Sequence, residues 1–348
     1  METLWFCIAA LAVTAYVVLD GFDFGAGILH LTVARTDAER RQVLGAIGPF
    51  WDGNEVWLLA AGGVLFLAFP RVLASGLSGF YLAIMLVLWV LILRGVAIEF
   101  RSHVGDGMWR RFWDAAFCLA STLAPILLGA ALGNLIRGVP LEANGWFSLA
   151  LWDSFSPRGA LGILDWYTTL AGILALVALA HHGALFLAWR TDGVVRERSL
   201  ARAATAAPIL IGIWIAASVA TALVAPDLAA GAASRPLAWL AGGVAVAGMA
   251  TSIVARRRGR DLQAFLGSCA FVLGILAATA AAMFPVMLKS AGDPALSLTA
   301  FNAASRASAL GKALLWWPVG FVLAVGYFVL LFRLHRERVG PVTDHDGY

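Results

Sequence analysis

The sequence predicts an all-α, polytopic membrane protein in which nine transmembrane helices form two four-helix bundles plus one peripheral helix. Of its 348 residues, 61% are hydrophobic and only 13% are charged, whereas a soluble domain usually carries about 25% charged residues. Many apolar runs reach about 20 residues, the length that crosses a hydrocarbon core of ~30 Å. Arginines gather in alternate loops, as expected for a chain that crosses a membrane repeatedly.

Apolar runs between charged or Gly/Pro-rich breaks define the nine expected spans. They cover residues 4–30, 54–70, 77–98, 113–135, 164–189, 204–225, 236–255, 262–285 and 313–333. The longest break divides the chain into a first four-helix bundle (1–135), an extracytoplasmic loop (136–163), a second four-helix bundle (164–285) and a final part (286–348). That final part holds a loop, the ninth helix and a cytoplasmic tail.

The distribution of basic residues orients the chain. With the N-terminus outside and the C-terminus in the cytoplasm, most arginines fall in inner segments, including the run Arg256, Arg257, Arg258 and Arg260. This asymmetry predicts a multi-pass protein of a bacterial cytoplasmic (inner) membrane. The arginine run is interpreted as a cytoplasmic retention signal that touches anionic lipid heads. Nucleic acid is not an expected partner.

Carboxylates at membrane depth are the first candidate functional residues, because an ionisable side chain there is costly. Asp20 and Asp23 lie three residues apart near the inner end of the first span, on one helix face. Asp52 and Glu55 repeat that spacing at the inner start of the second span. Asp52 has two interpretations that spacing leaves open: a proton-relay residue, or the N-cap of a capping box.

Basic side chains accompany these carboxylates at similar depth. Arg94 lies within the third span, with Glu99 beyond it. It could extend its guanidinium to the interface, or pair with Asp20 or Asp23. Together these groups suit a hydrated proton path from the cytoplasm. The alternative is that these groups have no role in proton transfer and only mark the edge of the membrane.

Two adjacent histidines, His181 and His182, lie in the inner part of the fifth span. Transmembrane histidines can ligate haem, and His30 lies at a similar depth in the first span. Adjacent helical residues point about 100° apart, so one of the pair at most could serve a given site. We expect polar contacts between helices at His181 and His182. The scattered Cys7, Cys118 and Cys269 show no spacing typical of a metal site or disulfide framework.

Several segments resemble subunit II of the cytochrome bd-type quinol oxidases, including the cyanide-insensitive branch. They are LDGFDFGAG at 19–27, PFWDGNEVW at 49–57, SGFY at 78–81, LRGVAIEFR at 93–101 and HGAL at 182–185. The resemblance is dense over 19–101 and patchier afterwards. One departure is Gly95, since some relatives carry proline after the arginine.

The resemblance implies a haem-free subunit II of a quinol:oxygen oxidoreductase. Such a subunit pairs with the haem-bearing oxidase subunit I, shields its haem site and supplies cytoplasmic protons for reduction of dioxygen to water. Haem b and haem d would belong to the partner, and a small accessory subunit, quinol, quinone or membrane lipids could also bind. By match of motif, Asp52 would begin the proton path, with Asp23 and Arg94 in a second polar path or a structural pair.

Two rivals come from other functional classes. One is an ion-coupled secondary transporter that uses Asp20, Asp23 and Arg94 as its coupling site. The other is a stand-alone haem cytochrome that uses His30 with His181 or His182.

Overall fold

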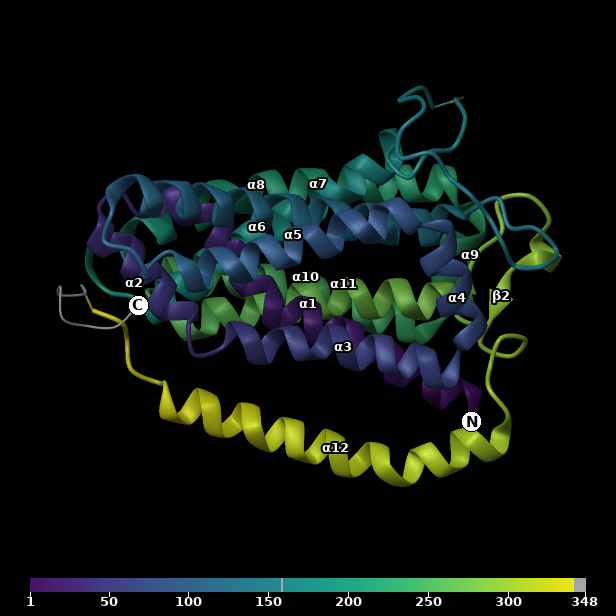
Figure 1. The fold of residues 1–348 in the computed structure, drawn as a ribbon. Helices are drawn as coiled ribbons and strands as arrows, with labels where there is room; N and C mark the ends of the chain where they lie inside the picture. The colour runs from purple at the N-terminus through teal and green to yellow at the C-terminus, as the bar shows by residue number, and fades with distance from the viewer. Residues whose placement is uncertain (158, 341–348) are drawn as a thin grey trace.

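The computed structural model describes residues 1–157 and 159–340, and helices dominate it (Figure 1). In chain order the elements are α1 (Glu2–Val33), α2 (Asp37–Ile47), α3 (Trp51–Ala68), α4 (Pro70–Gly79), α5 (Tyr81–Phe100), α6 (Gly107–Arg137), α7 (Trp166–Arg190), α8 (Gly193–Val224), α9 (Pro226–Ser234), α10 (Pro236–Arg257), α11 (Asp261–Met283), β1 (Val286–Leu288), the 3₁₀ turn η1 (Pro294–Leu296), β2 (Leu298–Thr299) and α12 (Ala307–Leu334).

The all-α, polytopic prediction is confirmed. Within the described residues, eight helices are long and apolar enough to cross a membrane, namely α1, α5, α6, α7, α8, α10, α11 and α12. The pair α3 and α4 makes a ninth when counted as one span, although the chain bends by 119° between them. The bend falls at Pro70, the first residue of α4, where a missing N–H and a fixed φ suit a new helix.

Helix α1 lies at the centre of the packing. It contacts α3 and α6 of the first half of the chain and α7 and α11 of the second half. Gly25 of α1 and Gly183 of α7 meet backbone to backbone, and a Cβ at either would overlap the other helix. Small residues at a helix crossing allow this close approach in membranes. Helix α12 runs along the outside of the bundle, where most of its side chains remain exposed (Figure 1).

The two ends of the bundle differ in charge and structure. One end carries α2, the turn between α10 and α11, and the chain after α12; we call it the arginine-rich end (Figure 1). There Arg338 pairs with Asp192 and Asp261, and Arg198 pairs with Glu39. The opposite end carries α4, α9 and the small antiparallel pair of β1 and β2.

Candidate functional site

Five polar side chains from three helices form a buried cluster in the first half of the chain. We call it the Asp20–Arg94 cluster; its members are Asp20 and Asp23 of α1, Asn54 and Glu55 of α3, and Arg94 of α5. Arg94 Nη1 donates to Asp20 Oδ1 at 2.6 Å, and Nη2 pairs with Glu55 Oε1. Asn54 Nδ2 donates to Asp23 Oδ2 at 2.7 Å and to the Leu19 carbonyl at 3.2 Å. Three helices are thus joined by polar side chains.

Burial makes this cluster unusual. Asp20, Asp23, Asn54 and Arg94 have no exposed surface, whereas the Glu55 side chain is 30% exposed. Arg94 therefore does not extend to the interface, and its guanidinium lies 4.1 Å from the Phe24 ring centre. Such an ion pair is costly to bury unless its members satisfy one another.

The charges of the cluster do not balance when every group is ionised. The cluster holds three carboxyl groups and one guanidinium: Arg94 pairs with Asp20 and Glu55, and Asp23 accepts its hydrogen bond from Asn54. Asp20 Oδ2 and Asp23 Oδ1 are buried without a hydrogen-bond partner among the described residues. Since uncompensated buried charge is expensive, a proton can relieve the imbalance. Protonation of one carboxyl group would therefore reduce the excess negative charge beside Arg94.

Asp52 stands outside these contacts, one helical turn before Glu55. Helix α3 begins at Trp51 with Phe50 as its N-cap, and no side chain caps it. The N-cap interpretation of Asp52 is therefore wrong, because Asp52 is the second helical residue. Its side chain is exposed and makes no hydrogen bond or ion pair with the described part of the chain. A carboxylate in the first helical turn is still favoured by the helix dipole.

Glu99 does not join the cluster. It is exposed near the end of α5. Among the described residues its carboxylate makes no hydrogen bond or ion pair, and its backbone carbonyl lies 2.7 Å from His103 Nδ1.

His181 and His182 of α7 each contact neighbouring helices through both ring nitrogens. His181 lies 3.2 Å from the Ala203 carbonyl and 3.3 Å from Ser252 Oγ. His182 lies 2.7 Å from Ser268 Oγ and 2.9 Å from the Val18 carbonyl. With both nitrogens engaged, neither ring offers a free nitrogen to a haem iron. The hydrogen bonds of His181 and His182 therefore do not fit a role as haem ligands.

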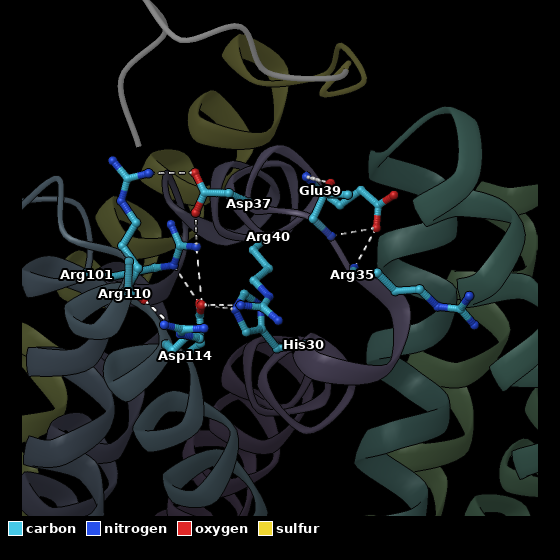
Figure 2. Close-up of polar contacts among 11 residues, drawn as sticks. His30, Arg35, Asp37, Glu39, Arg40, Arg101, Arg110 and Asp114 are labelled. Atoms are coloured by element: carbon cyan, nitrogen blue, oxygen red, sulfur yellow. Dashed lines mark hydrogen bonds and ion pairs between the residues drawn. The ribbon is translucent and has the colours of Figure 1, made fainter.

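A second cluster lies at the arginine-rich end (Figure 2). We call it the Asp114 cluster; its members are His30, Asp37, Arg40, Arg101, Arg110 and Asp114. Asp114 Oδ1 accepts from Arg101 Nε at 2.6 Å and contacts His30 Nε2 at 2.7 Å. Asp114 Oδ2 accepts from Arg40 Nη1 at 2.9 Å. The Nε2 atom of His30 is thus engaged with α6, whereas its Nδ1 is buried without a hydrogen-bond partner among the described residues.

Asp37 closes the Asp114 cluster on its exposed side. Its two oxygens accept from Arg101 Nη2 at 2.7 Å and Arg110 Nη1 at 2.9 Å. Although burial lowers the pKa of Arg101, its hydrogen bonds to Asp114 and Asp37 prevail, and they raise that pKa above its ordinary value. The cluster thus holds α1, α2, α5 and α6 together at this end.

Sequence reasoning missed Asp114 and the role of Asn54. Asp114 is the second residue of the predicted span 113–135, where a carboxylate looks like a membrane edge. Helix α6 in fact begins at Gly107, so Asp114 lies two turns inside it. Asn54 carries no charge, so it does not stand out among the ionisable residues at membrane depth. A buried amide beside two same-face carboxylates is the pattern that could have identified it.

The chain is similar in sequence to known proteins. Residues 1–335 match the family model described as cytochrome bd terminal oxidase subunit II. The chain is 32% identical to cytochrome bd-I ubiquinol oxidase subunit 2 of Escherichia coli, over 99% of this chain and 96% of that protein. It is 30% identical to the probable cytochrome oxidase subunit 2 of Haemophilus influenzae, covering 94% and 92%.

A solved structure shares the fold. A chain of the bd oxidase from Geobacillus thermodenitrificans superposes with a TM-score of 0.73 at 17% identity. The match covers 96% of this chain and 98% of that one. At this identity the likeness supports the arrangement of helices and nothing finer.

Proposed function

Since this chain belongs to the family of cytochrome bd terminal oxidase subunit II, we propose that it is a haem-free subunit that admits cytoplasmic protons. The chain is a subunit of a cytochrome bd ubiquinol oxidase, an oxidoreductase complex, and a multi-pass bacterial membrane protein. Its complex contains haems and a partner oxidase subunit I. The proposal assigns proton supply to this chain and oxygen chemistry to the partner.

The continuity between an exposed carboxylate and a buried one carries the proposal. Asp52 is exposed, Glu55 follows one turn later and is partly exposed, and Arg94 links Glu55 to the fully buried Asp20. Ionisable groups at membrane depth are rare and indicate functional sites, proton relays among them. Protons would be taken up at Asp52 and Glu55 and held on the carboxyl groups of the Asp20–Arg94 cluster. Asn54 would orient Asp23, which would be a further proton-binding residue.

The direction of uptake rests on the charge asymmetry of the bundle. Short loops rich in arginine stay in the cytoplasm, and the arginine-rich end is the end at which α3 begins. We propose that this end faces the cytoplasm, with the N-terminus outside and the C-terminus inside.

The haems would be held by subunit I. The engaged ring nitrogens of His181 and His182 support this division of labour, as does the contact of His30 with Asp114. Haem, when bound in the complex, supplies the site at which dioxygen is reduced. This chain would exclude bulk water from that site and deliver protons toward it.

The face of α3 that carries Glu55 is the proposed contact with subunit I. A carboxylate exposed sideways at this depth is costly against lipid, so protein or confined water would cover it. Leu59 lies one turn after Glu55 on the same face and is 74% exposed. Covering this face would bury Leu59 and enclose the start of the proton path.

Substitution of Asp52 tests the proposal. Asp52→Asn removes the proton-binding carboxylate while preserving size, and Glu197→Gln is the control. Glu197 is an exposed residue of α8 whose carboxylate makes no hydrogen bond or ion pair with a described residue. We expect quinol-driven oxygen consumption to slow at least roughly tenfold in Asp52→Asn, with normal haem content, and to stay unchanged in Glu197→Gln. Equal turnover in both variants would refute the assignment.

A further inference from the structure

An open groove follows α10 at the arginine-rich end, far along the chain from the Asp20–Arg94 cluster. It has a volume of about 310 Å³ and is lined by Ala250, Thr251, Val254, Ala255, Arg258 and Gln263. The first five positions repeat at three- and four-residue intervals, so they form one face of α10 and its C-cap. Along α10 the groove is lined by three apolar side chains and the Thr251 hydroxyl, and near the turn after α10 it is lined by the polar Arg258 and Gln263.

The turn between α10 and α11 brings the polar residues together. Gly259 adopts φ +67°, a backbone conformation that favours glycine, and Arg260 N–H donates to the Ala255 carbonyl at 2.9 Å. Gln263, in the first turn of α11, thereby lies beside Arg258. Gln263 Oε1 accepts from Arg260 Nη1 at 3.4 Å, which leaves its amide N–H groups free to donate to a ligand.

Arg257 and Arg258 are among the arginines of this end that no carboxylate of the described residues neutralises. Their side chains are exposed and have no hydrogen bond or ion pair with residues 1–157 or 159–340. Several other arginines of this end do pair with carboxylates, namely Arg40, Arg101, Arg110, Arg196, Arg198 and Arg338. The positive charge of Arg258 thus lines the groove, and that of Arg257 lies next to it in the chain.

We propose that this groove binds one anionic phospholipid. Its acyl chain would lie along Ala250, Thr251 and Val254, and its phosphate would receive N–H groups from Arg258 and Gln263. Arg257 would add charge at the headgroup. Two observations support a lipid. The apolar part of the groove continues the membrane-spanning face of α10, where an acyl chain would lie. The arginines lie at the end of that face, where the phosphates of lipid headgroups gather. The proposal is independent of the proton path, because it concerns different helices.

Lipid titration of the purified oxidase complex tests the site. The complex in detergent is titrated with phosphatidylglycerol in mixed micelles, and bound lipid is counted by native mass spectrometry. Each basic residue near an anionic headgroup contributes about fivefold in affinity at low salt. We therefore expect Arg257→Gln/Arg258→Gln to weaken binding of one phosphatidylglycerol by roughly 25-fold. Phosphatidylcholine should bind no more tightly to the wild type than to this variant.

Two further variants separate the groove from general surface charge. Arg333→Gln/Arg336→Gln removes two exposed arginines from another part of the same end and should keep the bound lipid. Ala250→Phe fills the groove without changing charge and should displace it. Inorganic phosphate, compared with chloride at equal ionic strength, should not compete. The proposal would be overturned if both double arginine variants lost the bound lipid equally. It would also be overturned if Ala250→Phe kept the lipid, or if phosphate competed with the lipid for binding.

Discussion

Arg94 Nη1 lies 2.6 Å from Asp20 Oδ1, and both side chains are completely buried between α1 and α5. The two residues are 74 positions apart in the chain. A second nitrogen of the same guanidinium reaches Glu55, whose side chain is partly exposed. One arginine thus connects a carboxylate sealed inside the bundle with one that meets the surroundings.

Removing Arg94 alone should destabilise the complex. Arg94→Met leaves Asp20 and Glu55 without their cation, and breaking a buried pair from one side costs about 3–5 kcal/mol. We expect a lower thermal unfolding midpoint and less assembled complex, measured by haem-linked absorbance.

A charge-free version separates stability from proton transfer. The triple variant Arg94→Met, Asp20→Asn, Glu55→Gln removes all three charges, so it should recover most of the stability lost in Arg94→Met. Its turnover should remain low, because two of the carboxyl groups proposed to hold protons, those of Asp20 and Glu55, are gone. Full turnover in the triple variant would make this cluster a purely structural pair.

The Asp114 cluster should matter for assembly and leave turnover unaffected. Asp114→Asn weakens the partner of Arg101, Arg40 and His30 together, so a loss of about 3–5 kcal/mol is expected. Asp153→Asn, an exposed residue at the other end, is the control. The yield of complex should fall only in Asp114→Asn, and turnover per assembled haem should stay within about twofold of wild type. A selective loss of turnover would instead draw Asp114 into the proton path.

The contacts of Glu39 predict that the stability of the folded protein depends on pH. Burial is the largest single effect on the pKa of Glu39 and raises it, but hydrogen bonds from the Arg35 and Thr36 backbone and from Arg198 together outweigh burial, and the pKa falls below its ordinary value of 4.5. A carboxyl with a lowered pKa stabilises the fold above its unfolded pKa, and this contribution disappears as pH falls through the folded pKa. The unfolding midpoint of Glu39→Gln should therefore lie below that of wild type at pH 7. The gap should narrow below pH 4.5, and a gap that widens with acidity would contradict this sign.

The proposed contact of α3 with subunit I can be tested by added bulk. Leu59→Trp places an indole on the Glu55 face, whereas Ile215→Trp does so on α8, where Ile215 is 58% exposed. Overpacking a protein interface costs about 1–3 kcal/mol, while lipid accommodates the extra volume. Co-purification of haem with this chain should fall only for Leu59→Trp. Equal effects would place lipid on both faces.

The positions of the spans could be predicted well where apolar composition alone decides. The expected spans 236–255 and 262–285 agree closely with α10 and α11. The span 204–225 was predicted too short, since α8 begins at Gly193 and continues through charged residues outside the apolar run. The short helices α2, α4 and α9 were missed, because 9 to 11 residues give no membrane-length signal.

The ionisable residues of the Asp20–Arg94 cluster could be predicted from the sequence, but Asn54 could not, and the contacts among them only partly. Helical spacing identified Asp20 with Asp23 and Asp52 with Glu55 as same-face pairs. It could not assign Arg94 to Asp20 and Glu55 while leaving Asp23 to Asn54, because these contacts cross between helices. Likewise, no local pattern links His30 to Asp114, 84 residues away.

Proton uptake during a single turnover tests the central claim most directly. The fully reduced complex is mixed with oxygen, and a pH-indicator dye in the bulk solution is followed together with haem absorbance. The wild type and Glu197→Gln should take up protons in step with haem oxidation. In Asp52→Asn, uptake should lag behind by roughly tenfold or more while the haem content is normal. Uptake at the wild-type rate in Asp52→Asn would contradict a proton path that begins at Asp52.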